Sequence, residues 1–517
     1  MTGDRLPVPV SPYGPLGDLA LHVHGLTLRG HHPETLVAAD EAVAVARLYG
    51  DARTERMVDM GRVYALAALG RLTEALAVSE RLAELTGAAT GPRTTDAKIL
   101  ADTGDMLIRI GRIDEGLHHM ARAMAMLEVA PRGTWRYLSA MSSLSGAAQA
   151  AELYELADMW LTDIFGDVAL DFDDLYRSAG DLQRAELRQE WALRLQQVGH
   201  EDEAATLFAS SVELLRYWQD RELDAPLCAA LLAVGLAKIG AYEHALALVG
   251  KLLIPMREAG QWHEARLLHL AHGVALREFG DLIGARRELL AADELAVLPN
   301  QRLIYRYELA VLAVRESPGP TTQAMLETVR FQLQLLWRLR LDRRTMLRQA
   351  RRRVELEDAR ARADLVASSD ALTGLGNRRT FDLRIEGLRD NLLLMDVDRF
   401  KAINDVFSHV VGDRVLSEIA TVLRTQSRPG DVPIRLGGDE FAMFLPGDVL
   451  GAAALAERIR QVVLGRDWAS IAPGLSVTVS MGLAAPAEGL IGRELYDRAD
   501  RRLYEAKHAG RNRLIFG

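Results

Sequence analysis

A short motif recurs about every 40 residues through the first 300 positions, and this regularity constrains the fold more than any other feature of the sequence. In its clear copies a glycine is followed five positions later by a small residue, as in Gly70 to Ala75 and Gly240 to Ala245. The copies begin at 30, 70, 111, 152, 199, 240 and 280, separated by 40, 41, 41, 47, 41 and 40 residues. The first is weak, and in the fourth Glu152 replaces the glycine. A fixed period of this size is typical of solenoid proteins.

Each repeat unit is interpreted as a helix, a tight turn and a second helix. The glycine provides the left-handed residue that ends the first helix, and the small residue lets the second helix pack closely on it. Apolar residues at helical spacing then give each hairpin a face that only a stacked neighbour can bury; examples are Leu66, Leu69, Leu76 and Leu82. We therefore expect a flexible N-terminus at 1–18 and an all-α helical-repeat solenoid at 19–316. The pattern resembles tetratricopeptide-type repeats, although their usual period is about 34 residues.

A solenoid presents a concave surface, and most solenoids work by binding. The functional interpretation of 19–316 is a docking surface for an unidentified protein or small effector. The alternative is a spacer that only separates other parts of the chain.

A long connector helix is expected at 321–369, because Ser317 to Pro320 breaks the helical pattern and no glycine or proline follows until after Ser368. Apolar residues fall on one heptad stripe, namely Leu326, Val329, Leu333, Leu336, Leu347, Ala350, Val354 and Ala361. Arg340, Arg343, Glu357 and Asp364 interrupt it. We interpret this stripe as an imperfect parallel coiled coil that carries a signal, with a plain linker as the alternative.

The balance of charge limits the partners of the chain. The formal net charge is −9, whereas a general nucleic-acid binder is usually basic. We therefore interpret the basic stretch at 338–353 as a solvated face and expect no nucleic-acid partner. No apolar run is long enough to span a bilayer, and the N-terminus lacks a signal-peptide pattern. We expect a cytoplasmic protein with no membrane span.

From Asp370 onward strands and helices alternate, which predicts an α+β domain at 370–517. Strands are expected at 391–397, 432–436, 441–445 and 476–483, and helices at about 411–426 and 495–509. The two middle strands are joined by Gly437, Gly438, Asp439 and Glu440, a composition that favours a tight hairpin turn. The chain is therefore multidomain.

The acidic residues at these strand ends point to metal chemistry. Asp396 closes one strand and Asp439 lies in the hairpin turn, so their carboxylates converge if the two elements are neighbours. Mg²⁺ is commonly held by one or two carboxylates together with substrate phosphates. Lys401, Lys507 and Arg511 are basic residues placed to reach phosphates, while an amide and a carboxylate at Asn404 and Asp413 match a purine edge.

The C-terminal segment resembles the GGDEF family of diguanylate cyclases over residues 370–517. The signature is Arg435 to Phe441, RLGGDEF, and it is accompanied by DALTGLGNR at 370–378 and MDVDRFKAIND at 395–405. Further matching blocks follow in order around His409, Asp413, 479–482, 499–507 and 510–512.

The resemblance implies roles for individual residues. Asp396, Asp439 and the carbonyl of Val397 would bind Mg²⁺, with Mn²⁺ as the alternative, and Asp439 or Glu440 would help to deprotonate the 3′-hydroxyl of GTP. Substrate would be bound at Asn404, Asp413, His409, Lys401, Gly437, Gly438, Lys507 and Arg511. Family members work as two domains face to face, which implies a homodimer. The implied reaction condenses two GTP into cyclic di-GMP and two pyrophosphates, under control of the repeats.

Arg428 and Asp431 fit the family's inhibitory Arg-x-x-Asp site, where cyclic di-GMP would restrain its own synthesis. The sequence departs from the family at Gly376, usually proline, and at Ser408, usually glycine. Ser408 is expected to cost a little stability if that residue needs a positive φ angle. The rival interpretation is a non-catalytic scaffold that binds GTP or cyclic di-GMP and passes on a signal.

Overall fold

The computed structural model describes residues 16–84, 94–132, 134–165, 174–219, 221, 226–386, 390–487 and 492–516. The chain folds as two compact units, Met1–Glu355 and Leu356–Gly517. Most of the N-terminal segment predicted to be flexible, up to residue 15, lies outside the described residues, and the first helix already begins at Gly17.

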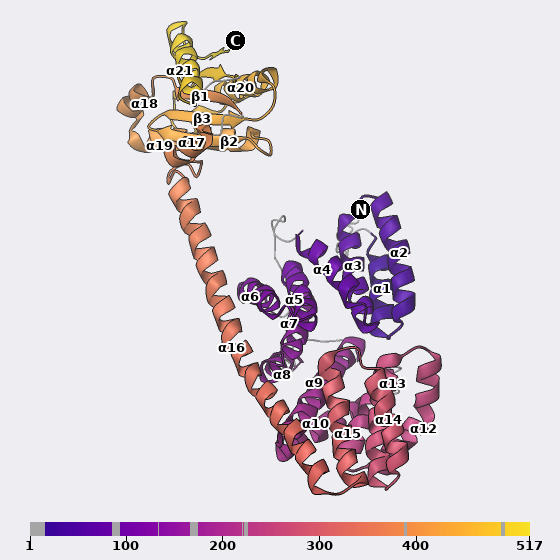
Figure 1. The fold of residues 1–517 in the computed structure, drawn as a ribbon. Helices are drawn as coiled ribbons and strands as arrows, with labels where there is room; N and C mark the ends of the chain where they lie inside the picture. Colours follow the sequence, from indigo (N-terminus) through magenta and orange to yellow (C-terminus); the bar gives the residue numbers. More distant parts are fainter. Residues whose placement is uncertain are drawn as a thin grey trace. The chain divides into compact units, whose positions relative to one another are not determined.

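The described part of the first unit is helical, and each of its first fifteen helices contacts the next along the chain (Figure 1). These helices are α1 Gly17–Leu28, α2 His32–Leu48, α3 Ala52–Ala68, α4 Leu72–Glu84, α5 Thr94–Arg109, α6 Ile113–Glu128, α7 Trp135–Ala150, α8 Tyr154–Phe165, α9 Asp174–Val198, α10 Glu201–Gln219, α11 Pro226–Lys238, α12 Tyr242–Glu258, α13 Trp262–Glu278, α14 Leu282–Glu294 and α15 Pro299–Glu316.

The motif glycines occupy turns between these helices, and their predicted left-handed conformation is confirmed. Gly30, Gly70, Gly111, Gly199, Gly240 and Gly280 have φ values of 80°, 75°, 92°, 92°, 86° and 86°. Glu152, which replaces a glycine, has a φ of 56°. The turn before α13 has the same conformation at Gly260, with a φ of 70°. Ala265 follows five positions later, so this is a further copy of the motif that the 40-residue spacing conceals.

The small residues of the motif let neighbouring helices approach closely, as predicted. Ala75, Ala204, Ala245 and Ala285 have no exposed surface. At Gly116 an added Cβ would lie 2.7 Å from the carbonyl oxygen of Gly104 on α5, which is closer than any side chain tolerates. The sequence motif therefore specifies helix pairs with tight contacts at their turns.

Helix α16, Pro320–Ser368, packs its predicted heptad stripe against helices of its own chain. Leu326 and Leu333 are buried with Tyr307 of α15. Leu347 and Val354 belong to a core cluster formed mainly by α5 to α8. Along residues 326–354 most of this apolar stripe is therefore covered by helices of the first unit and not by the helix of a second chain; Leu336 is the exception, at 41% exposed.

The basic stretch of α16 is solvated only in part, because Arg338, Arg344, Arg348, Arg352 and Arg353 are exposed whereas three other arginines pair with acidic residues elsewhere in the first unit. Arg340 pairs with Glu155 at 2.7 Å, Arg343 with Glu152 at 3.2 Å and Arg351 with Glu128 at 2.6 Å. Arg343 also donates a hydrogen bond to the carbonyl oxygen of Ala151, just beyond the C-terminal end of α7. Because a helix C-terminus carries partial negative charge, this position favours a cation. These three arginines thus face acidic residues at helix ends.

The second unit is built on one mixed sheet with the strand order β2-β3-β1-β4-β5. Strand β1 is antiparallel to β3 and β4, and β5 is parallel to β4. The strands are β1 Asn391–Val397, β2 Val432–Gly437, β3 Glu440–Leu445, β4 Val479–Ala484 and β5 Leu514–Ile515. The helices are α17 Arg378–Ile385, α18 Phe400–Phe407, α19 His409–Gln426, α20 Val449–Leu464 and α21 Gly492–His508. A 3-10 turn spans Trp468–Ser470.

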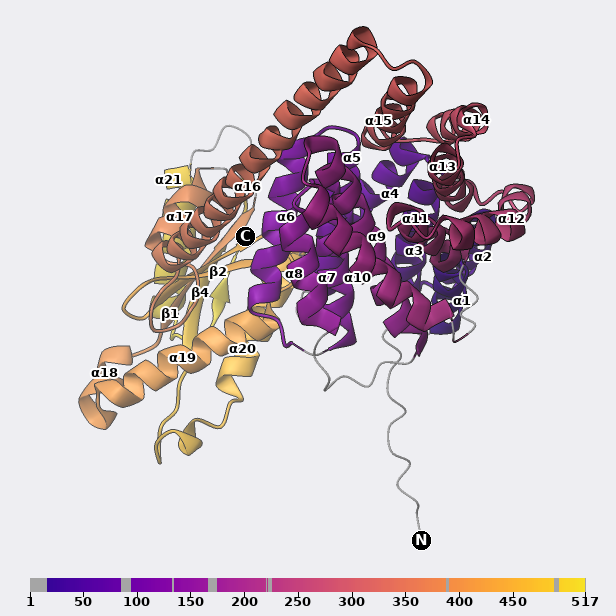
Figure 2. The same cartoon turned by 90° about the horizontal axis from the view of Figure 1, so that it is seen from below.

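Helices cover both faces of this sheet (Figure 2). Leu393 and Met395 of β1 pack with residues of α19 and α20, whereas Leu392 and Leu394 pack with residues of α17 and α21. Alternation along β1 therefore directs Asp396, two positions beyond Leu394, to the face covered by α21. No helix among the described residues is long and apolar enough to cross a membrane.

Candidate functional site

The end of β1 and the β2–β3 hairpin bring the predicted metal-binding residues together. Asp396 is paired with Glu440 in the register of β1 and β3. The backbone N–H of Val397 donates to the carbonyl oxygen of Asp439 at 3.2 Å. The tight turn is made by Gly437 and Gly438, whose φ values are 149° and 54°. Three acidic side chains thus start from adjacent backbone positions, with Asp396 buried, Asp439 half-buried and Glu440 exposed.

The carboxylate of Asp396 receives the ammonium group of Lys507, from α21, at 2.6 Å. Burial raises the pKa of Asp396 to about 6, Lys507 opposes this rise, and the charges of Asp439 and Glu440 add to it. Like charges in one place and a partly buried carboxylate make the site favourable for a cation. No cluster of three or more metal-binding side chains occurs in the described part of the chain. Two carboxylates and a carbonyl nevertheless fit a hard cation that shares substrate phosphates.

The expected guanine-binding residues lie on two contacting helices, α18 and α19. Asn404 lies directly against Gly412, where an added Cβ would collide with its side-chain oxygen. Asp413 is the next residue, so the structure brings Asn404 and Asp413 to the same junction. Lys401 and His409 are exposed on these helices. Within the described part of the chain, their side chains make no hydrogen bond or ion pair with the metal-binding residues.

The expected phosphate-binding residue Arg511 lies in a turn directly after α21 and is exposed. Lys507 is one turn earlier, in the last turn of that helix. The helix end therefore places two cations near β1, of which Lys507 contacts Asp396 directly.

Arg428 and Asp431 form a compact turn before β2. The backbone N–H of Arg428 donates to the Asp431 carboxylate at 2.7 Å, and the N–H of Asp431 donates to the carbonyl of Arg428 at 3.0 Å. The Arg428 side chain is exposed. The turn thus fixes the carboxylate and leaves the guanidinium facing solvent.

The segment that carries these site residues is also similar in sequence to a known protein family. The family model described as "Diguanylate cyclase, GGDEF domain" matches residues 367–513. These residues are a GGDEF domain.

The similarity to the following relatives extends over less than a third of the chain. The response regulator PleD of Caulobacter vibrioides is 42% identical over 164 residues, covering 29% of this chain and 36% of the relative. Diguanylate cyclase DgcP of Pseudomonas aeruginosa is 40% identical over 169 residues, or 31% of this chain and 25% of the relative. Diguanylate cyclase DgcS of Shewanella oneidensis is 35% identical over 155 residues, or 28% and 51%. The chain thus spans a quarter to a half of the length of these relatives.

Two solved structures align with parts of the chain. The GGDEF domain of DgcB from Caulobacter crescentus, in complex with c-di-GMP, is 33% identical with a TM-score of 0.28, covering 29% of this chain and 95% of that one. Diguanylate cyclase SiaD from Pseudomonas aeruginosa, in complex with its activator SiaC, is 29% identical with a TM-score of 0.34, covering 47% and 99%.

Sequence reasoning missed two further residues of the GGDEF domain. Asp398 is 8% exposed and accepts hydrogen bonds from Thr478 and Ser480 of the neighbouring strand segment. Arg435 pairs with Asp370 at 3.1 Å. The i, i+2 spacing from Asp396 could have indicated Asp398, since both carboxylates then lie on one face.

The two departures from the GGDEF pattern have local explanations. The N–H of Gly376 donates to the carbonyl of Pro433 at 3.1 Å, a hydrogen bond that proline could not make. Ser408 has φ 97° and ψ 158°, so the condition under which this serine is costly is met.

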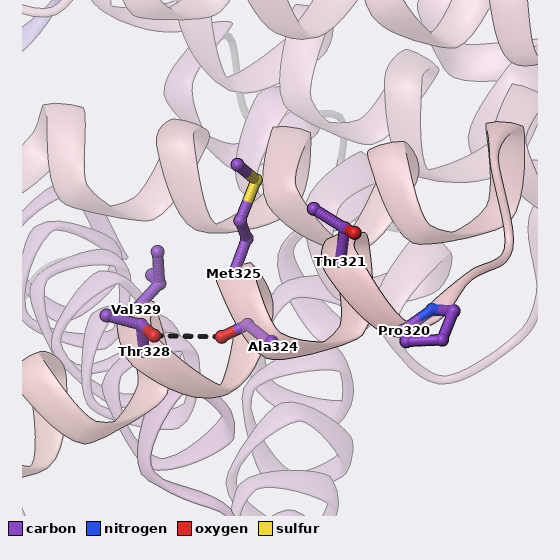
Figure 3. A pocket seen from close by; sticks show the side chains of 6 residues that line it. All are labelled: Pro320, Thr321, Ala324, Met325, Thr328 and Val329. Carbon is purple, nitrogen blue, oxygen red and sulfur yellow. Dashed lines mark hydrogen bonds between the residues drawn. The ribbon is translucent and has the colours of Figure 1, made fainter.

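A pocket of about 780 Å³ lies at the beginning of α16, outside the GGDEF domain (Figure 3). It is lined by Pro320, Thr321, Ala324, Met325, Thr328 and Val329. None of these side chains titrates or carries charge, and the Thr328 hydroxyl already donates to the carbonyl of Ala324 at 2.8 Å. The pocket has no group for acid–base or metal chemistry.

Proposed function

We propose that the chain is a diguanylate cyclase, which condenses two GTP molecules into cyclic di-GMP and two pyrophosphates. One observation carries the proposal: β1 and the β2–β3 turn place Asp396, the Val397 carbonyl and Asp439 at adjacent backbone positions. A module that binds only cyclic di-GMP would not need this acidic group, whereas one that binds GTP with Mg²⁺ would keep it, so the assay below separates catalysis from binding.

In the proposed reaction, the 3′-oxygen of one GTP attacks the α-phosphorus of the other, and pyrophosphate leaves. Asp439 or Glu440 accepts the proton of the hydroxyl, and a second, equivalent step closes the ring. Mg²⁺, or Mn²⁺ as the alternative, would be held by Asp396, Val397 and Asp439 and would neutralise charge on the phosphates.

The remaining site residues bind and orient the substrate. Asn404 and Asp413 hold the guanine edge, while Lys507 and Arg511 contact the phosphates. The substrate is also contacted by Lys401, His409, Gly437 and Gly438. Because one domain offers one set of these residues and the reaction joins two nucleotides, catalysis requires a homodimer. Cyclic di-GMP would bind at Arg428 and Asp431 and inhibit its own synthesis. Because the proposed substrate, GTP, is available in the cytoplasm, the proposed location of the protein is the cytoplasm.

The first unit is the proposed regulatory part, a helical-repeat sensor for an unidentified effector. Helix α16 supports this role because it is one uninterrupted helix whose first part is packed on α6 to α8 and α15, and whose end at Ser368 lies two residues before Asp370. An effector that changes the packing of residues 326–354 would change the helix that enters the GGDEF domain.

The decisive assay incubates the purified full chain with GTP and either Mg²⁺ or Mn²⁺, and follows cyclic di-GMP by chromatography. The double variant Asp439→Ala, Glu440→Ala removes the proposed catalytic carboxylates. Glu505→Ala is the matched control, because this glutamate is exposed on α21. Product from the wild type and the control alone supports the cyclase. Two results together would establish the non-catalytic alternative. GTP would bind tightly, and no product would form with either metal, even in the charge-reversal variant Arg340→Glu, Arg343→Glu, which is expected to release α16.

A further inference from the structure

Three consecutive residues after α21 have left-handed backbone conformations. Gly510, Arg511 and Asn512 have φ values of 111°, 63° and 43°. Glycine adopts this region freely, but for arginine it costs roughly 1–2 kcal/mol. Such strain persists only where the surrounding structure holds it, and it is concentrated at functional sites. The side chains that bind this turn therefore indicate why its strained conformation is kept.

The carboxylate of Asp398 holds the turn from the side of the sheet. Its Oδ2 accepts the backbone N–H of Asn512 at 3.1 Å and the hydroxyl of Thr478 at 2.7 Å. Its Oδ1 accepts the hydroxyl of Ser480 at 2.6 Å. Asp398 is 8% exposed, so these donors satisfy a charged group that is largely removed from water.

The guanidinium of Arg460, on α20, holds the other side of the turn. Its Nη1 donates to the carbonyl oxygen of Asn512 at 3.0 Å and to its side-chain oxygen at 2.7 Å. Its other nitrogens pair with Glu457 at 2.9 and 2.6 Å, which fixes the orientation of the fork. The backbone N–H, the carbonyl and the side chain of Asn512 are thus all bound.

Asp396 and Asp398 lie on one face of the chain segment that ends β1, and each binds a different residue of the segment at the end of α21. Asp396 contacts Lys507 at 2.6 Å, and Asp398 contacts the N–H of Asn512, five residues later. Arg511 lies between these two fixed points and makes no contact with either carboxylate among the hydrogen bonds of the described residues. Its backbone is therefore set while its guanidinium is exposed.

We propose that Asp398 and Arg460 are positioning residues that act through Asn512 to aim Arg511 at the phosphates of GTP. This inference rests on the proposed function, in which Arg511 binds phosphate. An arginine fork binds phosphate best in a bidentate geometry, so a strained backbone that pre-sets its direction avoids ordering cost on binding.

The test is a double-mutant cycle on the full chain. Binding of an α,β-methylene analogue of GTP with Mg²⁺ is measured by calorimetry, which does not depend on turnover. Arg511→Ala is expected to weaken binding by ~10-fold or more, as for the loss of a charge-assisted hydrogen bond. Asp398→Asn places an N–H₂ group against hydroxyl or N–H donors and should weaken binding by at least ~5-fold. In the Arg511→Ala background, Asp398→Asn should have less than about a twofold effect.

Asp448→Asn is the matched control, because this exposed aspartate caps α20, where asparagine caps equally well. Arg460→Gln tests the second contact with the same cycle, and remains informative if Asp398→Asn proves unfolded by circular dichroism. Additive losses would overturn the inference, because Asp398 and Arg460 would then act through something other than Arg511. If Arg511→Ala alone binds the analogue normally, the phosphate-binding role within the proposed function has failed, which is a different result.

Discussion

The carbonyl oxygen of Gly438 accepts hydrogen bonds from two nitrogens of the Arg435 guanidinium, at 3.0 and 2.8 Å. The third nitrogen of the fork donates to Asp370 at 3.1 Å. Burial alone would raise the pKa of Asp370, but hydrogen bonds from Thr373 and Arg435 hold it below its usual value. Arg435 thus joins the residue that opens the GGDEF domain to the turn that carries Asp439.

Replacement of Arg435 by lysine should impair this turn without unfolding the domain. A lysine ammonium keeps the charge but cannot span both Gly438 and Asp370 as a planar fork does. We expect cyclase activity to fall by roughly 10- to 100-fold, since small displacements of reacting groups are costly, while the thermal midpoint changes little. Initial rates and thermal unfolding measure the two effects, and an unchanged rate would contradict the positioning role of Arg435.

Replacement of Ser408 by glycine should stabilise the GGDEF domain. With φ 97° and ψ 158°, Ser408 occupies a region that is almost restricted to glycine and costs of order 1–3 kcal/mol for other residues. We expect a gain of about 1 kcal/mol in the free energy of unfolding, measured with urea. The control, Ser417→Gly in the interior of α19, should instead lose about 0.5 kcal/mol. Equal effects of the two variants would rule out relief of strain at Ser408.

Replacement of Glu152 by glycine should destabilise the first unit, although Glu152 has a left-handed backbone conformation that glycine adopts more easily. Glycine would relieve about 1 kcal/mol of backbone strain. However, the carboxylate pairs with Arg343 at 3.2 Å and with Arg194, whose side chain is 3% exposed, at 3.3 Å. Leaving a buried arginine without that charge costs roughly 3 kcal/mol or more. We predict that Glu152→Gly lowers the free energy of unfolding of the first unit by about 2 kcal/mol, and a stabilised variant would show that the ion pairs contribute little.

The stability of the first unit should depend on Glu308 between pH 5 and 2. Burial opposes its ionisation, but Lys238 and Arg277, at 2.6 and 2.7 Å, outweigh burial and lower its pKa to about 2. A carboxyl with a lowered folded-state pKa stabilises the fold above its unfolded pKa, near 4.5, and this contribution is lost as pH falls towards 2. The contribution is on the order of 3 kcal/mol. Glu308→Gln should therefore be destabilised at pH 7 and should show a flatter loss of stability below pH 5 than the wild type does.

Charge reversal should release α16 from the first unit. In the variant Arg340→Glu, Arg343→Glu, two attractive pairs with Glu155 and Glu152 become repulsive. We expect faster hydrogen exchange over residues 326–354 and an altered rate of cyclic di-GMP synthesis. Restoring the first pair with Glu155→Arg should recover part of the protection. Unchanged exchange would mean that apolar packing alone holds the helix, because exposed pairs contribute only about 0.2–1 kcal/mol each.

The metal-binding end of the sheet could be predicted from the sequence because its determinants are local. Strand β1 was expected at 391–397 and spans Asn391–Val397, and two glycines before Asp439 specify the hairpin turn. The prediction for the last large strand is less accurate, because the sequence predicts 476–483 and β4 spans Val479–Ala484. Its first residues lie in an irregular segment whose Thr478 bonds Asp398.

Residues whose partners are distant in sequence could not be predicted. The basic pattern around Arg340 is the same whether its arginines face solvent or acids, and Glu155 is 185 positions away. Asp398 likewise depends on Asn512, 114 positions later. A heptad stripe shows only that one face of a helix is apolar, so it does not reveal whether another chain or the same chain covers that face.

The hydrogen bonds of Gly376 have a consequence for association. Strand β2 is an outer strand, and an open outer strand can recruit a strand from another molecule. Here Gly376 accepts the N–H of Arg435 at 2.8 Å and donates to the carbonyl of Pro433, which itself has no N–H. The β2 border of the sheet is therefore capped from within at Pro433 and Arg435. A domain proposed to meet its own copy around two nucleotides is thereby shielded, along this part of β2, from pairing with that copy strand to strand.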